Sequence, residues 1–178
     1  MTRAEWRVRA ANEGDRGLLG GFECADPTLP WTAEVEREIQ TRLMDWAAAP
    51  GARDDDPRLL LVFQRGSGEL VGLAAHERVF LGLSETQVFA ATKLYVVAVS
   101  HTWQGQRFAN GQRASDVVMA AAMTDIEARV PPRNARVYAI VHESNTRSIA
   151  LCKRHGLVHE LSRPSPEYVR LITAHRSR

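Results

Sequence analysis

The segment Val99-Ser-His-Thr-Trp-Gln-Gly-Gln-Arg-Phe-Ala109 decides our interpretation of this chain. It follows an apolar stretch, residues 88–99, and leads into residues 109–129, which are rich in alanine and methionine. That order predicts a strand, a loop and a helix. A helix start presents backbone N–H groups and the positive end of the helix dipole, so the junction can bind a phosphate. Gly105 and Ala109 are small, which lets the backbone come close to such a group.

A second segment, Asn145-Thr-Arg-Ser-Ile-Ala-Leu-Cys-Lys-Arg-His-Gly-Leu157, predicts another helix. Asn145 is a favoured residue for capping a helix start, and Gly156 is the residue type that commonly follows a helix end. The segment comes directly after the apolar residues 136–142, which predict a strand.

The remaining patterns predict a single domain that contains both strands and helices. Asn12 and Thr32 are the expected caps of the first two helices. The expected strands are 6–10, 59–63, 70–80, 88–99, 136–142, 157–161 and 168–174, and the expected helices are 13–22, 33–48, 109–129 and 145–155.

Taken in this order, the two quoted segments resemble the acyl-CoA loop and the following helix of GCN5-related N-acetyltransferases. The resemblance covers nearly the whole chain, residues 1–178. It implies an α/β (α+β) fold in which a central mixed, mostly antiparallel sheet of about seven strands is flanked by four helices. The positions that fit the family pattern are Gln104, Gly105, Phe108, Ala109, Asn145, Ser148, Ile149, Leu151, Gly156 and Leu157.

The resemblance also implies a set of residues that hold acetyl-CoA as a co-substrate. The strand end supplies backbone hydrogen bonds to the pantetheine arm, and the loop holds the pyrophosphate. The expected residues are Val97, Ala98, Val99, Gln104, Gly105, Gln106, Arg107, Phe108, Ala109 and Asn145.

Two loop positions depart from the family pattern. His101 replaces a proline, and Arg107 replaces a glycine. The Arg107 guanidinium can fork onto a phosphate and strengthen the site. Alternatively, its side chain and restricted backbone narrow the loop and weaken the site.

Cys152 stands where the family has a tyrosine that protonates the leaving coenzyme A thiolate. A thiol, with an ordinary pKa of about 8.5, can do the same, or it can be a nucleophile if its pKa is lowered. The third interpretation is a buried cysteine that only packs. For the general base, Glu143 is the first candidate and Glu77 the second, and each can equally be a solvated carboxylate at a strand end.

Charge is uneven along the chain. Residues 101–178 hold 12 Lys and Arg against 6 Asp and Glu, a net charge of +6. That suits a polyanion such as coenzyme A, and it suits RNA equally well. The arginines considered for RNA are Arg147, Arg154, Arg163, Arg170, Arg176 and Arg178.

Several function classes are not expected. The six histidines are scattered, so we expect no metal site. No run of apolar residues is long enough for a membrane span, and the N-terminus lacks the apolar core of a signal peptide. The two cysteines, Cys24 and Cys152, are expected to be free thiols of a cytoplasmic protein.

The sequence hypothesis is therefore an N-acetyltransferase that moves an acetyl group to a primary amine of a small molecule or a protein, by direct transfer in a ternary complex. The acidic region around the second predicted helix, with Phe22, Trp31 and Trp46, is expected to cover the acceptor pocket. One alternative is a non-catalytic acyl-CoA-binding or interaction module. Another is an acetyltransferase toxin that acts on aminoacyl-tRNA, although nucleic acid is the less favoured partner. Edge strands near the C-terminus often pair in this family, which leaves a homodimer open.

Overall fold

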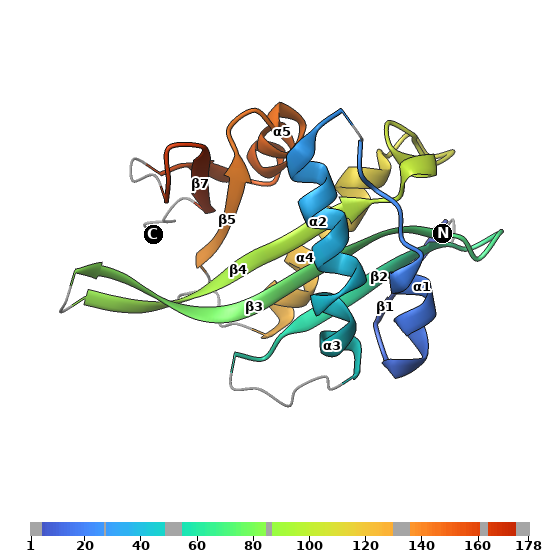
Figure 1. Cartoon of the computed structure of the whole chain (residues 1–178), viewed down its shortest axis with the longest axis horizontal. Coiled ribbons are helices and arrows are strands. Elements are labelled where there is room, and N and C mark those ends of the chain that lie inside the picture. The colour runs from blue at the N-terminus through green and yellow to red at the C-terminus, as the bar shows by residue number, and fades with distance from the viewer. Residues whose placement is uncertain are drawn as a thin grey trace.

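Seven strands form one sheet in the order β1-β2-β3-β4-β5-β7-β6 (Figure 1). The computed structural model describes residues 5–26, 28–48, 55–84, 87–129, 136–160 and 164–173. β4 and β5 run parallel, and the other neighbouring strands pair antiparallel. The strands are β1 (Trp6–Ala10), β2 (Arg58–Gln64), β3 (Leu70–Ser84), β4 (Gln87–Val99), β5 (Arg136–His142), β6 (Leu157–His159) and β7 (Tyr168–Thr173). The predicted mixed, mostly antiparallel sheet is confirmed.

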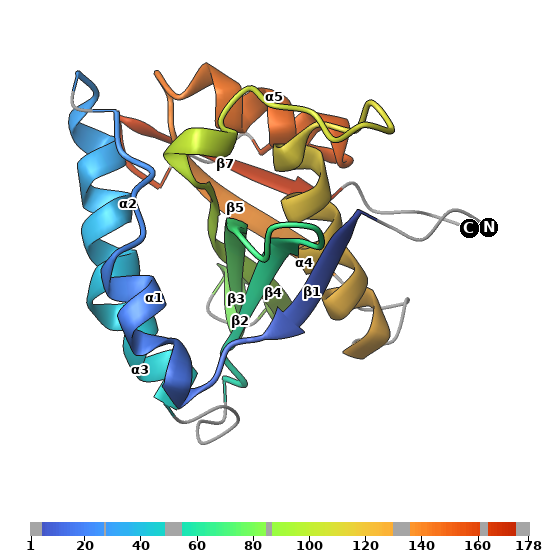
Figure 2. The ribbon, with the colours of Figure 1, turned by 90° about the vertical axis from the view of Figure 1, so that its right-hand side faces the viewer.

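Helices cover both faces of the sheet. Figure 2 shows α1, α2 and α3 on one face and α4 on the other, with α5 beside β5 and β7. The helices are η1 (Glu13–Asp15), α1 (Arg16–Gly20), α2 (Pro30–Gln40), α3 (Arg42–Ala48), η2 (His101–Trp103), α4 (Ala114–Arg129) and α5 (Thr146–Arg154). Among the described residues, no helix has the length and apolar character needed to cross a membrane.

Each face has its own apolar core. The α4 face buries Val118, Met119 and Ile126 of the helix against the sheet. The opposite face buries Ile39 and Leu43, together with other residues of the α1–α3 layer. The sheet is thus covered on both sides, which fixes its position between the two helical layers.

The first two predicted helices differ in detail from the structure. Asn12 is a cap as predicted, because its side chain accepts the Gly14 N–H at 2.9 Å. The helix predicted over 33–48 begins earlier, at Pro30, and is interrupted at Thr41, where α2 ends and α3 follows. Thr32 is inside the helix rather than its cap, and its hydroxyl donates to the Leu29 carbonyl at 2.6 Å.

The helix predicted from Ala109 begins later, at Ala114. A tight turn precedes it, in which Gly111 has a φ of +84° and donates to the Phe108 carbonyl at 2.8 Å. Phe108 itself is buried between two tryptophans, Trp6 and Trp103, with ring centroids 5.2 and 5.1 Å away. Burial of this side chain holds residues 108–112 in a turn, so the helical path cannot start there.

A bulge in β4 separates β4 from β5. Ala75 on β3 pairs with Val96 and His76 pairs with Leu94, so Tyr95 is an extra residue without a partner on β3. Pairing with β5 runs only from Ala91 to Leu94 on the β4 side. A bulge bends its strand and increases the local twist, which accounts for the separation of the two strands beyond this point.

We predict that Gly72→Ala lowers the free energy of unfolding by about 3 kcal/mol, as measured by urea denaturation. A Cβ at this position on β3 would lie 2.4 Å from the Ala98 carbonyl oxygen and 2.9 Å from Val118 Cγ2. Gly17→Ala in α1 is the matched control, since a Cβ there meets nothing within 4 Å. It should leave stability unchanged or raise it by up to about 1 kcal/mol. Equal effects of the two substitutions would contradict the close approach of α4 to β3.

Candidate functional site

A cavity of about 160 Å³ opens where β4 and β5 separate. β4 lines it from Leu94 to Val97, and β5 lines it from Ala139 to His142. The helices complete the lining with Trp31, Glu34 and Val35 of α2, Met119 of α4, and Ser148, Leu151 and Cys152 of α5; Asn145 and Tyr168 line it as well.

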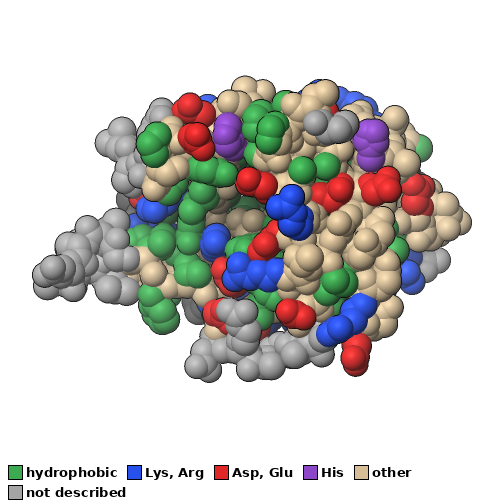
Figure 3. All heavy atoms as spheres, viewed as in Figure 1, with side chains coloured by type: hydrophobic (Ala, Val, Ile, Leu, Met, Phe, Trp, Pro, Cys, Tyr) green, Lys and Arg blue, Asp and Glu red, His purple; other side chains and the backbone are tan. Residues whose placement is uncertain are grey.

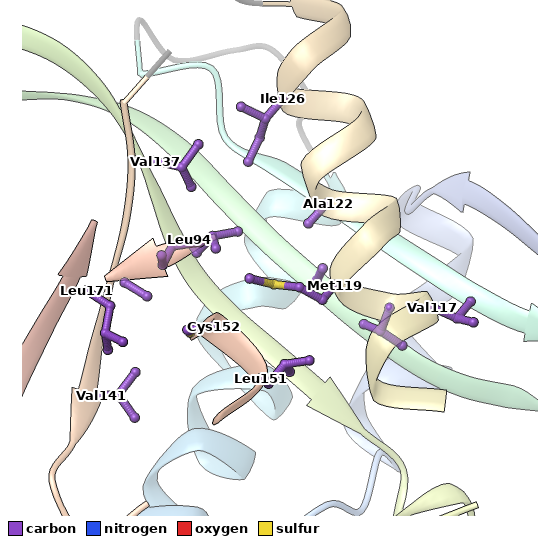
Figure 4. Close-up of a cluster of buried hydrophobic side chains, with 14 of the residues drawn as sticks. Leu94, Val117, Met119, Ala122, Ile126, Val137, Val141, Leu151, Cys152 and Leu171 are labelled. Atoms are coloured by element: carbon purple, nitrogen blue, oxygen red, sulfur yellow. The ribbon is translucent and has the colours of Figure 1, made fainter. Parts of the chain in front are cut away.

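The inner wall of the cavity is apolar. Figure 4 shows Leu94, Met119, Val141, Leu151 and Cys152 converging from β4, α4, β5 and α5. All five side chains are buried. An apolar inner wall with polar groups only near the opening suits a ligand with a small apolar end.

The wall that β4 contributes also carries unused backbone hydrogen-bonding capacity. Beyond Leu94, the β4 groups that face β5 have no strand partner. Unpaired strand edges favour an extended ligand that adds to the sheet. Of the predicted strand residues, Val97 lines the cavity, Ala98 is buried in the α1–α3 core, and the Val99 carbonyl accepts from the Gln104 side chain at 3.3 Å.

The predicted phosphate loop lies between β4 and α4. Gln104 ties the loop to the preceding chain, because its side-chain NH2 also donates to the Cys24 carbonyl at 2.7 Å. Gly105 has a φ of +77°, a conformation that L side chains rarely adopt. The Gln106 N–H donates to the Trp103 carbonyl at 3.1 Å. These contacts fix the path of the loop without involving a ligand.

Arg107 is bound within the loop. Its guanidinium donates to the Gly111 carbonyl at 2.6 Å, and its backbone forms an isolated bridge with Arg113. The forked contact with a phosphate, one of the two interpretations of the sequence, therefore competes with an existing hydrogen bond. The amides of Ala109 and Asn110 bind the two carboxylate oxygens of Glu5, at 2.9 and 3.1 Å.

Between the end of β4 and the first turn of α4, five amides donate to no residue that the structure describes: those of Thr102, Gly105, Arg107, Arg113 and Ser115. Arg113 and Ser115 lie at the first turn of α4, where the helix dipole is positive. The loop and the helix start therefore keep backbone N–H groups without a described acceptor, and this set of residues differs from the predicted one.

The two α5 candidates both reach the cavity. Asn145 caps the helix, with its Oδ1 accepting the Ser148 N–H at 3.1 Å, and its side-chain NH2 donates to no described residue. Cys152 is buried, and burial raises the pKa of its thiol to about 11. A thiol that holds its proton at neutral pH is a poor nucleophile but can donate a proton.

An aromatic cluster forms the outer wall. Trp31 of α2 stacks on His142 at the end of β5, with ring centroids 4.5 Å apart, and Tyr168 meets the same imidazole edge-on at 5.3 Å. The Ser144 N–H donates to His142 Nδ1 at 3.2 Å. A neutral imidazole that accepts at Nδ1 carries its hydrogen on Nε2. In that tautomer Nε2–H is the donor of His142, a residue of the cavity lining.

Tyr95, the bulged residue of β4, lines the cavity beside a charged pair. Its hydroxyl donates to a Glu38 carboxylate oxygen of α2, and Arg42 Nη1 donates to the same hydroxyl at 2.5 Å. Burial and the Glu38 carboxylate raise the pKa of Tyr95 to about 12. The phenol therefore stays protonated and connects the cavity to a carboxylate that is partly exposed to solvent.

The two predicted bases lie elsewhere. Glu143 is exposed just after β5, its N–H donates to the Glu167 carbonyl at 2.9 Å, and it does not belong to the cavity lining. Glu77 is buried on β3 with Lys93 Nζ 3.9 Å from its carboxylate. Their roles as bases stay predictions.

Sequence reasoning did not single out Tyr95, His142 or Glu38. Tyr95 depends on a bulge, which no pattern in residues 88–99 signals. His142 ends a predicted strand and comes just before the Asn145 cap, so its position before that helix was the available signal.

Charges on this face are mixed. Figure 3 shows acidic and basic side chains close together where α2 crosses the sheet, rather than one sign of charge. Glu36 of α2 is held in the structure, because its carboxylate accepts the Cys24 and Ala25 N–H groups at 2.6 and 2.8 Å. Glu34, which lines the cavity, is the carboxylate at its opening.

Comparison with known proteins gives the fold. No family model and no curated protein sequence matches this chain. Among solved structures, a bacterial toxin is 16% identical with a TM-score of 0.63, over 96% of this chain and 91% of that one. NAA60 of Arabidopsis thaliana with a bisubstrate analogue is 15% identical with a TM-score of 0.62, over 94% and 98%. The PaiA N-acetyltransferase of Thermoplasma acidophilum with coenzyme A is 10% identical with a TM-score of 0.65, over 96% and 99%. The chain therefore has the fold of GCN5-related N-acetyltransferases.

We predict that Cys152 reacts slowly with iodoacetamide at pH 8 and faster at higher pH, by about tenfold per pH unit up to pH 11, because only the thiolate reacts. The sign follows from the pKa of about 11, which burial raises above the ordinary value of a thiol. Mass spectrometry of a Cys24→Ser variant isolates this thiol. The unfolded protein is the control, and its rate should level off near pH 9. A native rate that also levels off near pH 9 would show that Cys152 is not buried.

Proposed function

We propose that this chain, which has the fold of GCN5-related N-acetyltransferases, transfers an acetyl group from acetyl-CoA to a primary amine. The observation that supports this best is the cavity between the separated β4 and β5, with an unpaired β4 edge on one side and α5 at its end. Acetyl-CoA supplies the activated acetyl thioester. Transfer is direct, within a ternary complex, because the protonated Cys152 thiol is a poor nucleophile.

Binding of the donor uses the two sets of backbone groups left unpaired. The β4 edge from Tyr95 to Val97 takes the pantetheine arm as an added strand. The free amides at Arg113 and Ser115, with Gly105 and Arg107, take the pyrophosphate at the start of α4. Val97, Gly105 and Arg107 belong to the residues that the resemblance implies for the cofactor, whereas Tyr95, Arg113 and Ser115 are additions to that set.

Deprotonation of the attacking amine uses Tyr95 and Glu38. As the hydroxyl oxygen accepts a proton from the amine, directly or through one water, the hydroxyl proton passes to the Glu38 carboxylate. Glu38 has 32% of its side chain exposed, so it can release the proton to solvent. This route needs no phenolate, which agrees with the raised pKa of Tyr95.

Cys152 is the proposed proton donor to the departing thiolate. The pKa of Cys152, about 11, is higher than that of a thiol in water, so Cys152 would protonate a thiolate of ordinary pKa only weakly. The departing sulfur, however, lies in the same desolvated cavity, where burial raises thiol pKa values in the same way. The pKa values of the two thiols are then similar, so proton transfer from one sulfur to the other costs little free energy.

The acceptor enters past Trp31 and Glu34, where a carboxylate favours a cationic amine. An RNA-borne acceptor has less support. Arg154 pairs with Asp116 at 2.8 Å and Arg170 with Glu160 at 2.9 Å, while Arg163, Arg176 and Arg178 lie outside the described residues. The acceptor proposed here is a small molecule or a polypeptide amine, and a homodimer through the β6 edge stays a prediction.

We predict saturable one-to-one binding of acetyl-CoA and coenzyme A in calorimetry, with dissociation constants below about 1 mM. Ser148→Phe should weaken binding at least tenfold, because Ser148 of α5 lines the cavity and a phenyl ring would obstruct it. Ala150→Phe, on the exposed side of the same helix, is the matched control and should bind like the wild type. Absence of heat at millimolar ligand would leave an interaction module as the better description; binding without turnover on any amine would indicate a non-catalytic acyl-CoA-binding protein.

We predict that Tyr95→Phe lowers kcat about 100-fold with KM for acetyl-CoA nearly unchanged, since the phenyl ring keeps its packing on Trp46 and loses only the hydroxyl. Steady-state kinetics with the best amine found in a screen measures this. Tyr138→Phe, a buried tyrosine of β5 outside the cavity lining, is the control and should keep kcat within about twofold. Equal losses in both variants would rule out a specific role for the Tyr95 hydroxyl.

A further inference from the structure

Glu5 binds the phosphate loop as an anion would. Its two carboxylate oxygens accept the N–H groups of two successive residues, Ala109 at 2.9 Å and Asn110 at 3.1 Å. Consecutive backbone amides that converge on one anion form the type of concave site that proteins use for phosphates. Here the anion belongs to the chain itself, from a residue 104 positions earlier in the sequence.

The turn that Glu5 binds is otherwise satisfied by its own hydrogen bonds. Phe108 N–H donates to the Gln112 carbonyl at 2.9 Å, and Gln112 N–H donates to Asn110 Oδ1 at 3.0 Å. Gly111 is bonded to Phe108 and Arg107 as described above. The amides of Ala109 and Asn110 are therefore the ones for which the turn itself supplies no acceptor.

Glu5 is also fixed from its own side. The Arg65 N–H donates to the Glu5 carbonyl at 2.8 Å, and Arg65 Nε donates to the next carbonyl, of Trp6, at 2.9 Å. The Trp6 ring packs on Phe108. The backbone of residues 5 and 6 is thus held by Arg65, and the neighbouring Trp6 ring contacts the turn itself.

We propose that Glu5 is a positioning residue for the coenzyme A phosphates: it holds the turn 108–112 against β1 and so keeps the start of α4 open. The amides of Arg113 and Ser115 follow directly after this turn. If the turn moved toward the helix start, its residues would cover those amides. This inference rests on the proposed function, since it concerns the phosphate end of the same co-substrate.

The experiment compares Glu5→Gln and Glu5→Ala with the wild type, and Glu127→Gln, an exposed carboxylate of α4, is the matched control. Glu5→Gln should raise the dissociation constant of acetyl-CoA about tenfold, and Glu5→Ala more, through the loss of a charge-assisted contact. The kcat at saturating acetyl-CoA should stay within about twofold, because the reacting end of the cavity is unaltered. Binding of pantetheine, which lacks the phosphates, should not change.

A second measurement does not depend on the ligand. Arg107 and Arg113 are exposed on either side of the turn, so trypsin can report its mobility. Cleavage after these residues should be faster in both Glu5 variants than in the wild type and the control, at an unaltered melting temperature.

The outcomes separate the inference from the proposed function. Unchanged cleavage, or affinity that is unchanged or higher in Glu5→Gln, would overturn the inference; higher affinity would mean that Glu5 competes with the phosphates. A wild type that binds no acetyl-CoA would overturn the proposed function, and the trypsin comparison would then still decide whether Glu5 holds the turn.

Discussion

The end of pairing between β4 and β5 at Leu94 is the constraint on which the site depends. A continuous ladder would bring the two strands to hydrogen-bonding distance and leave no room between them. The bulge at Tyr95 prevents that, while β4 stays paired with β3 on both sides of the bulge. The backbone N–H and C=O groups of β4 beyond this point would cost free energy if they were buried without a partner, and the gap leaves them accessible to a ligand. The bulged residue is Tyr95, which lines the cavity and bonds to Glu38 of α2, so the irregularity that separates the strands also supplies a residue of the proposed proton route.

The surrounding helices keep this gap from closing. α4 packs closely on β3, where Gly72 leaves room for the Val118 side chain. α5 contributes Leu151 and Cys152 to the inner wall, so the gap is closed at its inner end by side chains and remains open toward α2. Trp31 then narrows the opening by stacking on His142. The sheet and the helices on its two faces therefore determine the shape of the cavity together.

Much of the fold followed from local pattern. Strands such as 136–142 and the α5 helix with its Asn145 cap and Gly156 stop were predicted almost at their boundaries, because caps and apolar runs act within a few residues. The start of α4 was not, since Phe108 is drawn into a contact with Trp6, a residue far away in sequence. The candidate site divides in the same way. Cys152 and Asn145, which line the cavity, could be singled out from the sequence because they lie on a motif. The role of Tyr95 depends on strand register and that of Glu38 on a contact between α2 and β4, neither of which a single segment encodes.

Two of the three departures from the family pattern, Arg107 and Cys152, are accommodated differently. At position 107, an arginine in place of a glycine is tolerated because its guanidinium is used inside the turn, on the Gly111 carbonyl, and the turn is in turn held by Glu5. At position 152, the small thiol side chain preserves the apolar wall of the cavity. Its pKa of about 11, however, makes it a weaker acid than a thiol in water. Proton transfer there depends on both sulfurs being desolvated together, so its efficiency rests on how well the cavity excludes water. In the proposed mechanism the amine side has no such dependence, because the acceptor of the Tyr95 proton is a carboxylate that solvent reaches. The proposed chemistry thus places the step that tolerates water at the open end of the cavity and the step that requires its exclusion at the closed end.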